Sequence, residues 1–356
     1  MKDYQISINK GVATAEPRVG GTFSNDPYTV LQRALDSLDQ GGSIELSSGV
    51  FDFRDEPTIN GLSNEQPPTK QIKITGQGYS TKIVQNTKGK NAISVKNGIS
   101  FFLDDVYIYV GREAKSGILF DVTGDGRHSV WGGGFNNVFV QSDSMTNAAV
   151  HLKNFFDLNV PHLQVSSNNN YGIILENASK DVSYGNSNFG FVRSKGSRDK
   201  HAGLLLKSSD ANSPMNLNTF QNFQSNGSYR GIESQVSARN VFQFVDIEDA
   251  FQPIYFDGSK TGGDTRYTEI RSGYILARDK GTAITNTLYT GGNKINCFVE
   301  DDQNRMLVSD ASQYRPINSY NLQTFGRGSE RVDIKSPNIP MRFERVDGSF
   351  FDNRNK

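Results

Sequence analysis

Two short apolar segments alternate along the chain, and this repeat limits the possible folds more than any other feature. The first kind recurs at intervals of 22 to 32 residues, with small or turn residues at Gly117, Ala149, Gly172, Gly203, Gly231, Pro253 and Gly281. The second kind recurs at intervals of 22 to 28 residues, beginning at Asn218, Asn240, Thr268 and Asn293. Self-similarity at such a period is typical of a solenoid, in which each repeat buries its apolar face against the next.

Within each segment, apolar residues recur at every second position, which is the period of a β-strand. The pairs predicted to point inward are Ile118/Phe120, Val150/Leu152, Ile173/Leu175, Leu204/Leu206 and Ile254/Phe256, and in the second kind of segment Phe220, Phe242, Ile270 and Ile295. The sequence therefore predicts an all-β parallel solenoid over residues 41–300. At roughly 26 residues per turn it has about ten turns, stacked about 4.8 Å apart.

The two ends of the repeat have different sequence patterns. Residues 1–40 are predicted to form an N-terminal arm and a capping helix, because Asp26 is a good N-cap, Pro27 suits the first helical position and an apolar face follows up to Asp39. Such a helix would cover the open apolar end of the solenoid. Residues 301–356 lose the repeat and are predicted to be an irregular C-terminal region, with short strands near Arg331–Ile334 and Met341–Val346.

Composition excludes several classes of function. Lys and Arg number 38, as do Asp and Glu, so the net charge is zero and non-specific attraction to nucleic acid or to an anionic membrane is not expected. Cys297 is the only cysteine, and the histidines follow no metal-ligand spacing, so we expect no disulfide, no metal and no cofactor. No apolar run approaches the roughly 20 residues of a membrane span, and no export signal is recognisable.

The opening of the chain resembles a known structural superfamily. A helix starting at Tyr28 is followed by Gly41-Gly-Ser-Ile-Glu-Leu-Ser-Ser-Gly-Val-Phe-Asp-Phe, and then by the repeats. This order is similar to that of phage tailspikes and other proteins of the pectate-lyase-like superfamily, over roughly residues 20–300. The resemblance implies a right-handed, single-stranded parallel β-helix, often a homotrimer, that binds a bacterial surface polysaccharide. The catalytic motifs of polygalacturonases and pectate lyases are absent, so no catalytic residue follows from the resemblance.

Stacking brings equivalent outward positions of successive turns into contact and predicts two columns. One column alternates in charge and is interpreted as a ladder of exposed ion pairs: Asp121, Lys153, Glu176, Lys207, Gln235 and Asp257. The other is largely apolar: Leu119, His151, Ile174, Leu205, Glu233 and Tyr255. An outward apolar stripe predicts that another chain covers it, which favours a side-by-side homotrimer.

Glu233 interrupts the apolar stripe and is our first catalytic candidate. Desolvation disfavours the charged form of a carboxylate, and a glycosidase needs such a group as its general acid. Asp257 lies one turn after Glu233 and two residues farther along the strand, roughly 8 Å away by strand geometry. This separation suits the carboxylate pair of an inverting glycosidase. Asp246 and Glu248 are alternative partners in the same cluster. The competing interpretation is that these acidic residues are solvated and have only a structural role.

Four further residues are candidates for substrate binding. Trp131 precedes three glycines and could stack on a sugar from an exposed loop, or fill the solenoid interior. Tyr255 lies beside the carboxylate cluster. Glu269 and Arg271 flank the inward Ile270, so both point outward, either as sugar contacts or as a surface ion pair.

These observations predict a phage tailspike-like protein of the virion tail, outside the cell, that binds and hydrolyses a bacterial surface polysaccharide with a carboxylate pair. Other phage tail proteins are possible partners. The alternatives are a non-catalytic receptor-binding or structural tail protein and a polysaccharide lyase on the same fold.

Overall fold

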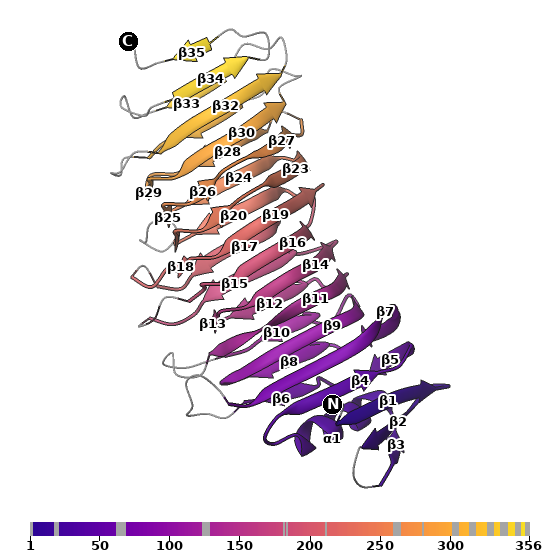
Figure 1. Cartoon of the computed structure of the whole chain (residues 1–356). Coiled ribbons are helices and arrows are strands. Elements are labelled where there is room, and N and C mark those ends of the chain that lie inside the picture. The colour runs from indigo at the N-terminus through magenta and orange to yellow at the C-terminus, as the bar shows by residue number, and fades with distance from the viewer. Residues whose placement is uncertain are drawn as a thin grey trace.

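The computed structural model describes residues 3–17, 21–61, 69–122, 129–180, 182, 184–210, 212–258, 265–279, 281–300, 306–312, 318–325, 331–334, 341–345 and 350–352. In these residues the chain winds as a parallel β-solenoid, with strands of successive turns lying one above another (Figure 1). The predicted all-β parallel β-helix is therefore confirmed.

Three sheets form the walls of the solenoid. Sheet I has one strand per turn: β6 (Thr58–Asn60), β8 (Ile93–Lys96), β10 (Ile118–Phe120), β12 (Val150–Lys153), β15 (Ile173–Asn177), β17 (Ala202–Ser208), β20 (Arg230–Gln235), β24 (Gln252–Asp257), β28 (Thr282–Asn286), β31 (Met306–Asp310) and β33 (Arg331–Ile334). Sheet III is short and comprises β18 (Met215–Asn216), β21 (Ser237–Ala238), β25 (Thr265–Arg266) and β29 (Thr290–Gly291).

Sheet II is the longest wall. Its parallel part comprises β4 (Gly42–Leu46), β5 (Gly49–Phe53), β7 (Gln71–Gln85), β9 (Ile99–Val110), β11 (Val130–Ser142), β13 (Phe155–Phe156), β14 (Asn159–Ser167), β16 (Asn188–Lys195), β19 (Thr219–Asn226), β22 (Val241–Phe242), β23 (Val245–Ala250), β26 (Glu269–Ile270), β27 (Gly273–Ala277), β30 (Lys294–Glu300), β32 (Ser319–Phe325) and β34 (Met341–Arg345).

The register of the sheets confirms both predicted sets of inward residues. Ile118 pairs with Val150 and Ile173 follows, while Phe220 pairs with Phe242 on the other wall. These side chains are at most 1% exposed. Phe220 stacks between Phe189 and Phe242 with ring centroids 4.6 Å apart on each side. The interior is thus a column of aligned apolar side chains rather than a single central core.

A buried asparagine ladder holds one corner of the solenoid. The Asn218 side chain donates to Asn240 Oδ1 at 2.9 Å, and Asn240 Oδ1 also accepts from the Asn218 backbone at 3.1 Å. Farther along, Asn318 Oδ1 accepts from the Asn293 backbone at 3.0 Å. These amides satisfy backbone groups that the turn would otherwise leave unpaired.

The N-terminal region supplies a small antiparallel unit and the predicted helix. Strands β1 (Tyr4–Asn9), β2 (Val12–Pro17) and β3 (Phe23–Asn25) pair antiparallel, and β1 then pairs parallel with β4. Helix α1 (Pro27–Ser37) starts at Asp26, whose carboxylate accepts from the Thr29 backbone at 3.2 Å. The apolar face of α1 joins the core at this end of the solenoid (Figure 1), where a cap was expected.

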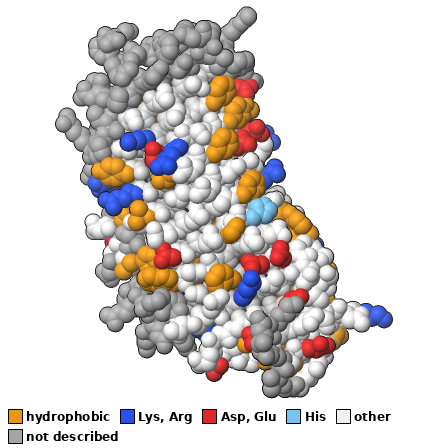
Figure 2. All heavy atoms as spheres, viewed as in Figure 1, with side chains coloured by type: hydrophobic (Ala, Val, Ile, Leu, Met, Phe, Trp, Pro, Cys, Tyr) orange, Lys and Arg blue, Asp and Glu red, His pale blue; other side chains and the backbone are white. Residues whose placement is uncertain are grey.

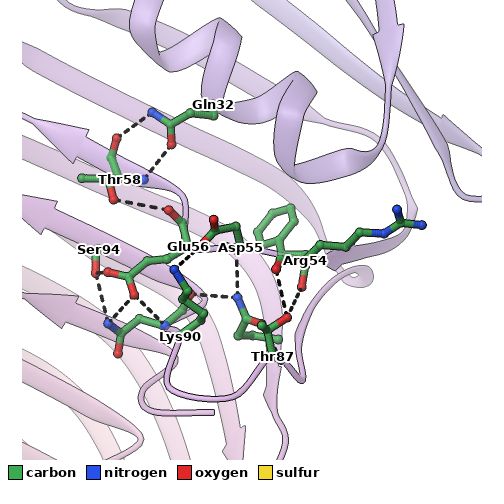
Figure 3. A network of polar contacts seen from close by, with 11 residues as sticks. Gln32, Arg54, Asp55, Glu56, Thr58, Thr87, Lys90 and Ser94 are labelled. Atoms are coloured by element: carbon green, nitrogen blue, oxygen red, sulfur yellow. Dashed lines mark hydrogen bonds and ion pairs between the residues drawn. The ribbon is translucent and has the colours of Figure 1, made fainter.

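Polar contacts tie α1 to the first turns (Figure 3). The Gln32 side chain accepts from Thr58 N at 2.8 Å and donates to Thr58 O at 3.0 Å, so it acts as an extra strand partner at the edge of β6. Nearby, Glu56 accepts from the Asn91 backbone at 3.0 Å and from the Ser94 hydroxyl. Helix and solenoid are therefore joined by directional bonds as well as by apolar contact.

The C-terminal region differs from the prediction. The expected strands are present as β33 and β34, although Val346 lies outside the described residues. They are not irregular additions, because β31 and β33 continue sheet I, and β32 and β34 continue sheet II, all with parallel pairing. Among the strands described after residue 300, β35 (Phe350–Asp352) differs and pairs antiparallel with β34. Parallel stacking therefore extends beyond residue 300, where the apolar repeat fades in the sequence.

Candidate functional site

The outward face of sheet I places Glu233 in a closed environment. Its side chain is 0% exposed. Oε1 lies 2.8 Å from the Arg230 guanidinium and also accepts from the Gln235 amide, whereas Oε2 has no hydrogen-bond partner among the described residues. These are the contacts of an internal ion pair, and they leave no open side from which a sugar could approach.

Arg230 is itself held on several sides. Its guanidinium lies 3.7 Å from the centre of the Tyr255 ring, and its Nε donates to Gln252 at 3.0 Å. A cation over an aromatic face is stabilised by the quadrupole of the ring. Burial, followed by the charge of Asp257, raises the pKa of Tyr255. Tyr255 is therefore committed to packing Arg230, although its half-buried ring keeps one side accessible.

Asp257 stacks on the same wall but is also enclosed. The register of β20 and β24 puts Gln235 opposite Asp257 and Glu233 opposite Tyr255, as predicted. Asp257 is 2% exposed, and Oδ1 accepts from the Thr287 hydroxyl at 3.1 Å. The structure thus brings Glu233 and Asp257 onto adjacent strands but turns neither carboxylate toward solvent.

The predicted charge ladder forms ion pairs, but they are partly buried rather than exposed, since the Glu176 side chain is only 13% exposed. Lys153 lies 3.3 Å from Asp121, and Lys207 lies 3.1 Å from Glu176. Glu176 also binds His151 at 2.6 Å. Burial alone would raise the pKa of Glu176, but the His151 hydrogen bond and the charge of Lys207 outweigh burial and lower it to about 2.

The apolar stripe on this face does not need a second chain to cover it. Leu119, Ile174 and Leu205 are 8%, 6% and 3% exposed in the single chain. Ala148 and Tyr171, from the turns that precede β12 and β15, pack with Ile174 and Leu205. The premise for the homotrimer was therefore wrong, since turn residues of the same chain close the stripe, and the homotrimer itself stays a prediction.

The other predicted site residues lie on sheet II, a different wall from that of Glu233 and Asp257. Glu269 and Arg271 form an exposed pair at 3.2 Å on sheet II, with side chains 37% and 50% exposed. Trp131 lies in strand β11 rather than in a flexible loop, and its ring packs 5.0 Å from that of Phe156. Asp246 and Glu248 lie on β23 of sheet II, so they do not join Glu233 and Asp257.

Sequence reasoning missed a long row of outward side chains on sheet II, which we call the outer band. Strand register places its members directly above one another: Lys82, Tyr107, Phe139, Gln164, Arg193, Gln224, Asp246, Tyr274 and Phe298. Eight steps of about 4.8 Å give a band about 38 Å long. Figure 2 shows hydrophobic, histidine and charged side chains following one another along this side of the molecule.

The N-terminal half of the outer band is aromatic. Tyr107 and Phe139 stack with centroids 5.2 Å apart, and Tyr79, which is 62% exposed, lies 5.7 Å from Phe139. Beside them His162 lies 5.3 Å from Phe191. The signal was available in the sequence, because aromatic residues alternate with inward Ile and Val in residues 106–110 and 138–140.

The middle of the outer band is polar and basic. A hollow of about 150 Å³ lies there, lined by residues that include Phe139, Gln164, Arg193 and Lys195. Arg193 is exposed and has no ion pair among the described residues. An aromatic ring, an amide and a cation are thus presented side by side on adjacent turns.

The C-terminal half of the outer band carries carboxylates beside aromatic rings. Asp246 and Glu248 are both half-buried and are two residues apart on β23, so they project from the same face. Glu248 accepts from the Asn226 amide at 3.0 Å. Tyr274 donates to Glu300 and stacks on Phe298 at 5.8 Å. Burial first, then Glu300, and then the charges of Glu248 and Asp246 raise the pKa of Tyr274.

Within the described residues no three His, Cys, Asp or Glu side chains lie close enough together to hold a metal ion. In the same part of the chain, no helix has the length and hydropathy of a membrane-crossing segment.

Comparisons with known proteins define the fold and no family. No protein-family description and no curated protein match the sequence. Among solved structures, ORF18 of Geobacillus virus E2 matches with a TM-score of 0.55 and 15% identity, over 93% of this chain and 61% of that one. The A-module of mannuronan C-5 epimerase AlgE6 from Azotobacter vinelandii matches with a TM-score of 0.53 and 11% identity, over 90% of this chain and 96% of that one.

These structural matches show a shared fold, which agrees with the resemblance seen in the sequence. The chain spans less than two thirds of the virus protein's length.

Proposed function

We propose that this protein binds a bacterial surface polysaccharide along the outer band. The observation that supports the proposal is the continuity of one column of aromatic, amide and charged side chains over about 38 Å. An elongated row suits an extended polymer, because each turn of the solenoid repeats the contact to the next sugar. Together with the resemblance of the opening segment to phage tailspikes, this band leads us to propose a tailspike-like role in a virion tail, outside the cell.

The chemistry of the outer band fits sugars. The flat C–H faces of pyranose rings can bury apolar area on Tyr107 and Phe139, which gains free energy without a deep cavity. Gln164 and Gln224 offer both donors and acceptors to hydroxyl groups. Arg193 adds a cation between them.

We further propose that, if the bound polymer is hydrolysed, Asp246 and Glu248 are the carboxylate pair. Two residues along a strand separate their Cα atoms by roughly 6.6 Å, which lets the carboxyl groups reach the separations that glycosidases use. Unlike Glu233 and Asp257, both are partly exposed; Asp246 belongs to the outer band, and Glu248 lies beside it, two residues along the same strand. Tyr274 lies opposite Asp246 on the next strand, and its hydroxyl is held by Glu300, so its ring is fixed beside the pair.

Binding is tested with purified capsule, lipopolysaccharide and exopolysaccharide from candidate hosts. Affinity electrophoresis or surface plasmon resonance compares the wild type with Tyr107→Ala and Phe139→Ala. Each change should weaken binding about 5- to 150-fold, which corresponds to a stacking energy of about 1 to 3 kcal/mol. Tyr229→Ala is the matched control, because that ring stacks on Phe251 away from the outer band. Unchanged binding by both variants would remove the outer band as the binding surface.

Catalysis is tested by the appearance of new reducing ends. Asp246→Asn and Glu248→Gln should abolish cleavage and retain binding. Cleavage that survives both changes but is lost in Glu233→Gln would show that Glu233 and Asp257, and not Asp246 and Glu248, are the catalytic carboxylates. Products that absorb in the ultraviolet as unsaturated uronates would identify a lyase. Binding with no cleavage would identify a receptor-binding protein. Sedimentation of the wild type and of Tyr107→Ala separates loss of binding from loss of a homotrimer.

A further inference from the structure

The hollow in the middle of the outer band carries two cations side by side. Arg193 and Lys195 are two residues apart on β16, so both project outward from sheet II, with Cα atoms roughly 6.6 Å apart. Both line the hollow of about 150 Å³, and none of its described lining residues is a carboxylate. The strands around it, β14, β16 and β19, and the turns that follow them, residues 168–172, 196–201 and 227–229, all lie within the described structure. The positive charge of the hollow is therefore that of a fully described part of the wall.

The residues that flank these cations in the sheet are neutral. Strand register places Arg193 between Gln164 and Gln224, and it places Lys195 beside Ser166. Neither cation has an ion pair among the residues that the structure describes. Two like charges held side by side without a counter-ion repel each other, and a bound anion would remove that repulsion.

Carboxylates farther along sheet II do not neutralise the two cations. Asp246 continues the column of Arg193, but it lies two strands away, at a distance of about 10 Å. Glu248, on the same strand, accepts from an amide of β19 at 3.0 Å. Asp249 forms an ion pair at 3.4 Å with an arginine of the turn after β16. The cations of the hollow are thus available to an anion from outside the chain.

The size and lining of the hollow fit one unit of a polymer. Its volume is well below the roughly 300 Å³ of sites that enclose a whole small ligand. Phe139 and Val165 supply an apolar side, and the Gln164 amide can meet hydroxyl groups. A uronate matches this combination, because its carboxylate is attached directly to the sugar ring, so that ring and charge occupy the same small space.

We propose that the polysaccharide of the outer band is acidic and that a uronate unit occupies this hollow, with its carboxylate between Arg193 and Lys195. A guanidinium presents parallel N–H groups that match the two oxygens of a carboxylate, and the ammonium group adds a second charged donor. The ring then lies over Gln164 and against Phe139. This inference rests on the proposed function and adds to it the charge and the class of the bound sugar.

The test compares two tetrasaccharides: cellouronate, a chain of four glucuronate units, and cellotetraose, in which glucose replaces each glucuronate. Calorimetry on the full chain should give an affinity for cellouronate at least about tenfold higher, as expected for a charge-assisted bond. The difference should shrink as salt is raised, because charges near the surface are screened. Equal affinity for the two tetrasaccharides, or binding of inorganic phosphate without binding of cellouronate, would overturn the inference, as would no binding of any probe.

Arg193→Gln is the informative variant, because it removes the charge and leaves an amide like those of Gln164 and Gln224 on either side. Arg193 is exposed, so the thermal midpoint should be unchanged, while cellouronate affinity falls at least about tenfold. Lys195→Gln should act in the same direction. Arg239→Gln is the matched control, since it removes an exposed arginine that follows β21 of sheet III. Wild-type cellouronate affinity in both Arg193→Gln and Lys195→Gln would show that the hollow is not the site.

Failure of this inference is distinguishable from failure of the proposed function. If both tetrasaccharides bind equally and Tyr107→Ala weakens both, the outer band binds sugars without regard to charge, and only the inference is wrong. If cellouronate affinity depends on Arg193 and is unchanged in Tyr107→Ala, the acidic-sugar site is supported and binding along the aromatic rings is not.

Discussion

The buried pair between Arg230 and Glu233 distinguishes a structural carboxylate from a catalytic one. Glu233 is 0% exposed and the Arg230 side chain 16% exposed, with 2.8 Å between the charged groups. Glu233→Gln removes one charge and leaves the other enclosed, and breaking such a pair costs about 3–5 kcal/mol. Because Arg230 keeps a little contact with solvent, we expect a loss of about 3 kcal/mol in the free energy of unfolding.

The assay is equilibrium unfolding in urea followed by circular dichroism, with polysaccharide cleavage measured on the same samples. Glu269→Gln is the matched control. Its pair with Arg271 has the same charges at 3.2 Å but lies at the surface, so its loss should cost at most about 1 kcal/mol. Adding Arg230→Gln to Glu233→Gln should restore part of the lost stability, because no unpaired charge remains inside.

The results of Glu233→Gln distinguish a catalytic role for Glu233 from a structural one. If Glu233→Gln unfolds like the wild type and polysaccharide cleavage disappears, Glu233 is a reacting group and its burial in the free chain must open for substrate. If stability falls and cleavage per folded molecule is unchanged, Glu233 is structural.

Three further predictions concern stability and chemistry. Glu176 has a folded pKa of about 2 against an ordinary value of 4.5. It therefore contributes about 3 kcal/mol to the free energy of unfolding above pH 4.5, and this contribution is lost as the pH falls toward 2. Glu176→Gln should flatten the acid side of a plot of thermal midpoint against pH. Phe220→Ala removes a ring stacked on two others and should lower the free energy of unfolding by about 3–5 kcal/mol in urea titrations, whereas a variant as stable as the wild type would contradict the stacked-core description. Asp246→Asn should leave the free energy of unfolding within about 0.5 kcal/mol of the wild type, since it is a partly exposed position, and reduce only the release of reducing ends.

Some features of the site could be read from the sequence and others could not. The columns that contain Glu233, Tyr255 and Asp257 were predicted in the correct register, because a period of two and a fixed repeat determine which residues meet. Their enclosure could not be predicted. It depends on Arg230, the first residue of β20, whose side chain turns back onto Glu233, and on turn residues such as Tyr171 and Thr287, which no strand periodicity describes.

The outer band was missed for a different reason. The repeat was recognised from residue 116 onward. Tyr107 and Phe139 lie in long strands, and their stacking appears only when the alternating residues of each strand are aligned with those of the strands above and below it in sheet II. Strands at β33 and β34 were predicted, but their parallel pairing with the sheets was missed, because the repeat spacing that would align them with the preceding turns fades past residue 300.

By itself the chain's sequence determined the winding, the inward residues and the order of the turns, because burial of alternate apolar side chains leaves few other ways to fold. Tertiary structure alone decided which outward side chains reach solvent. It enclosed Glu233 and Asp257 and left Tyr107, Asp246 and Arg239 accessible, because exposure depends on how the turns of neighbouring coils fold over each wall, and that is a property of packing in three dimensions.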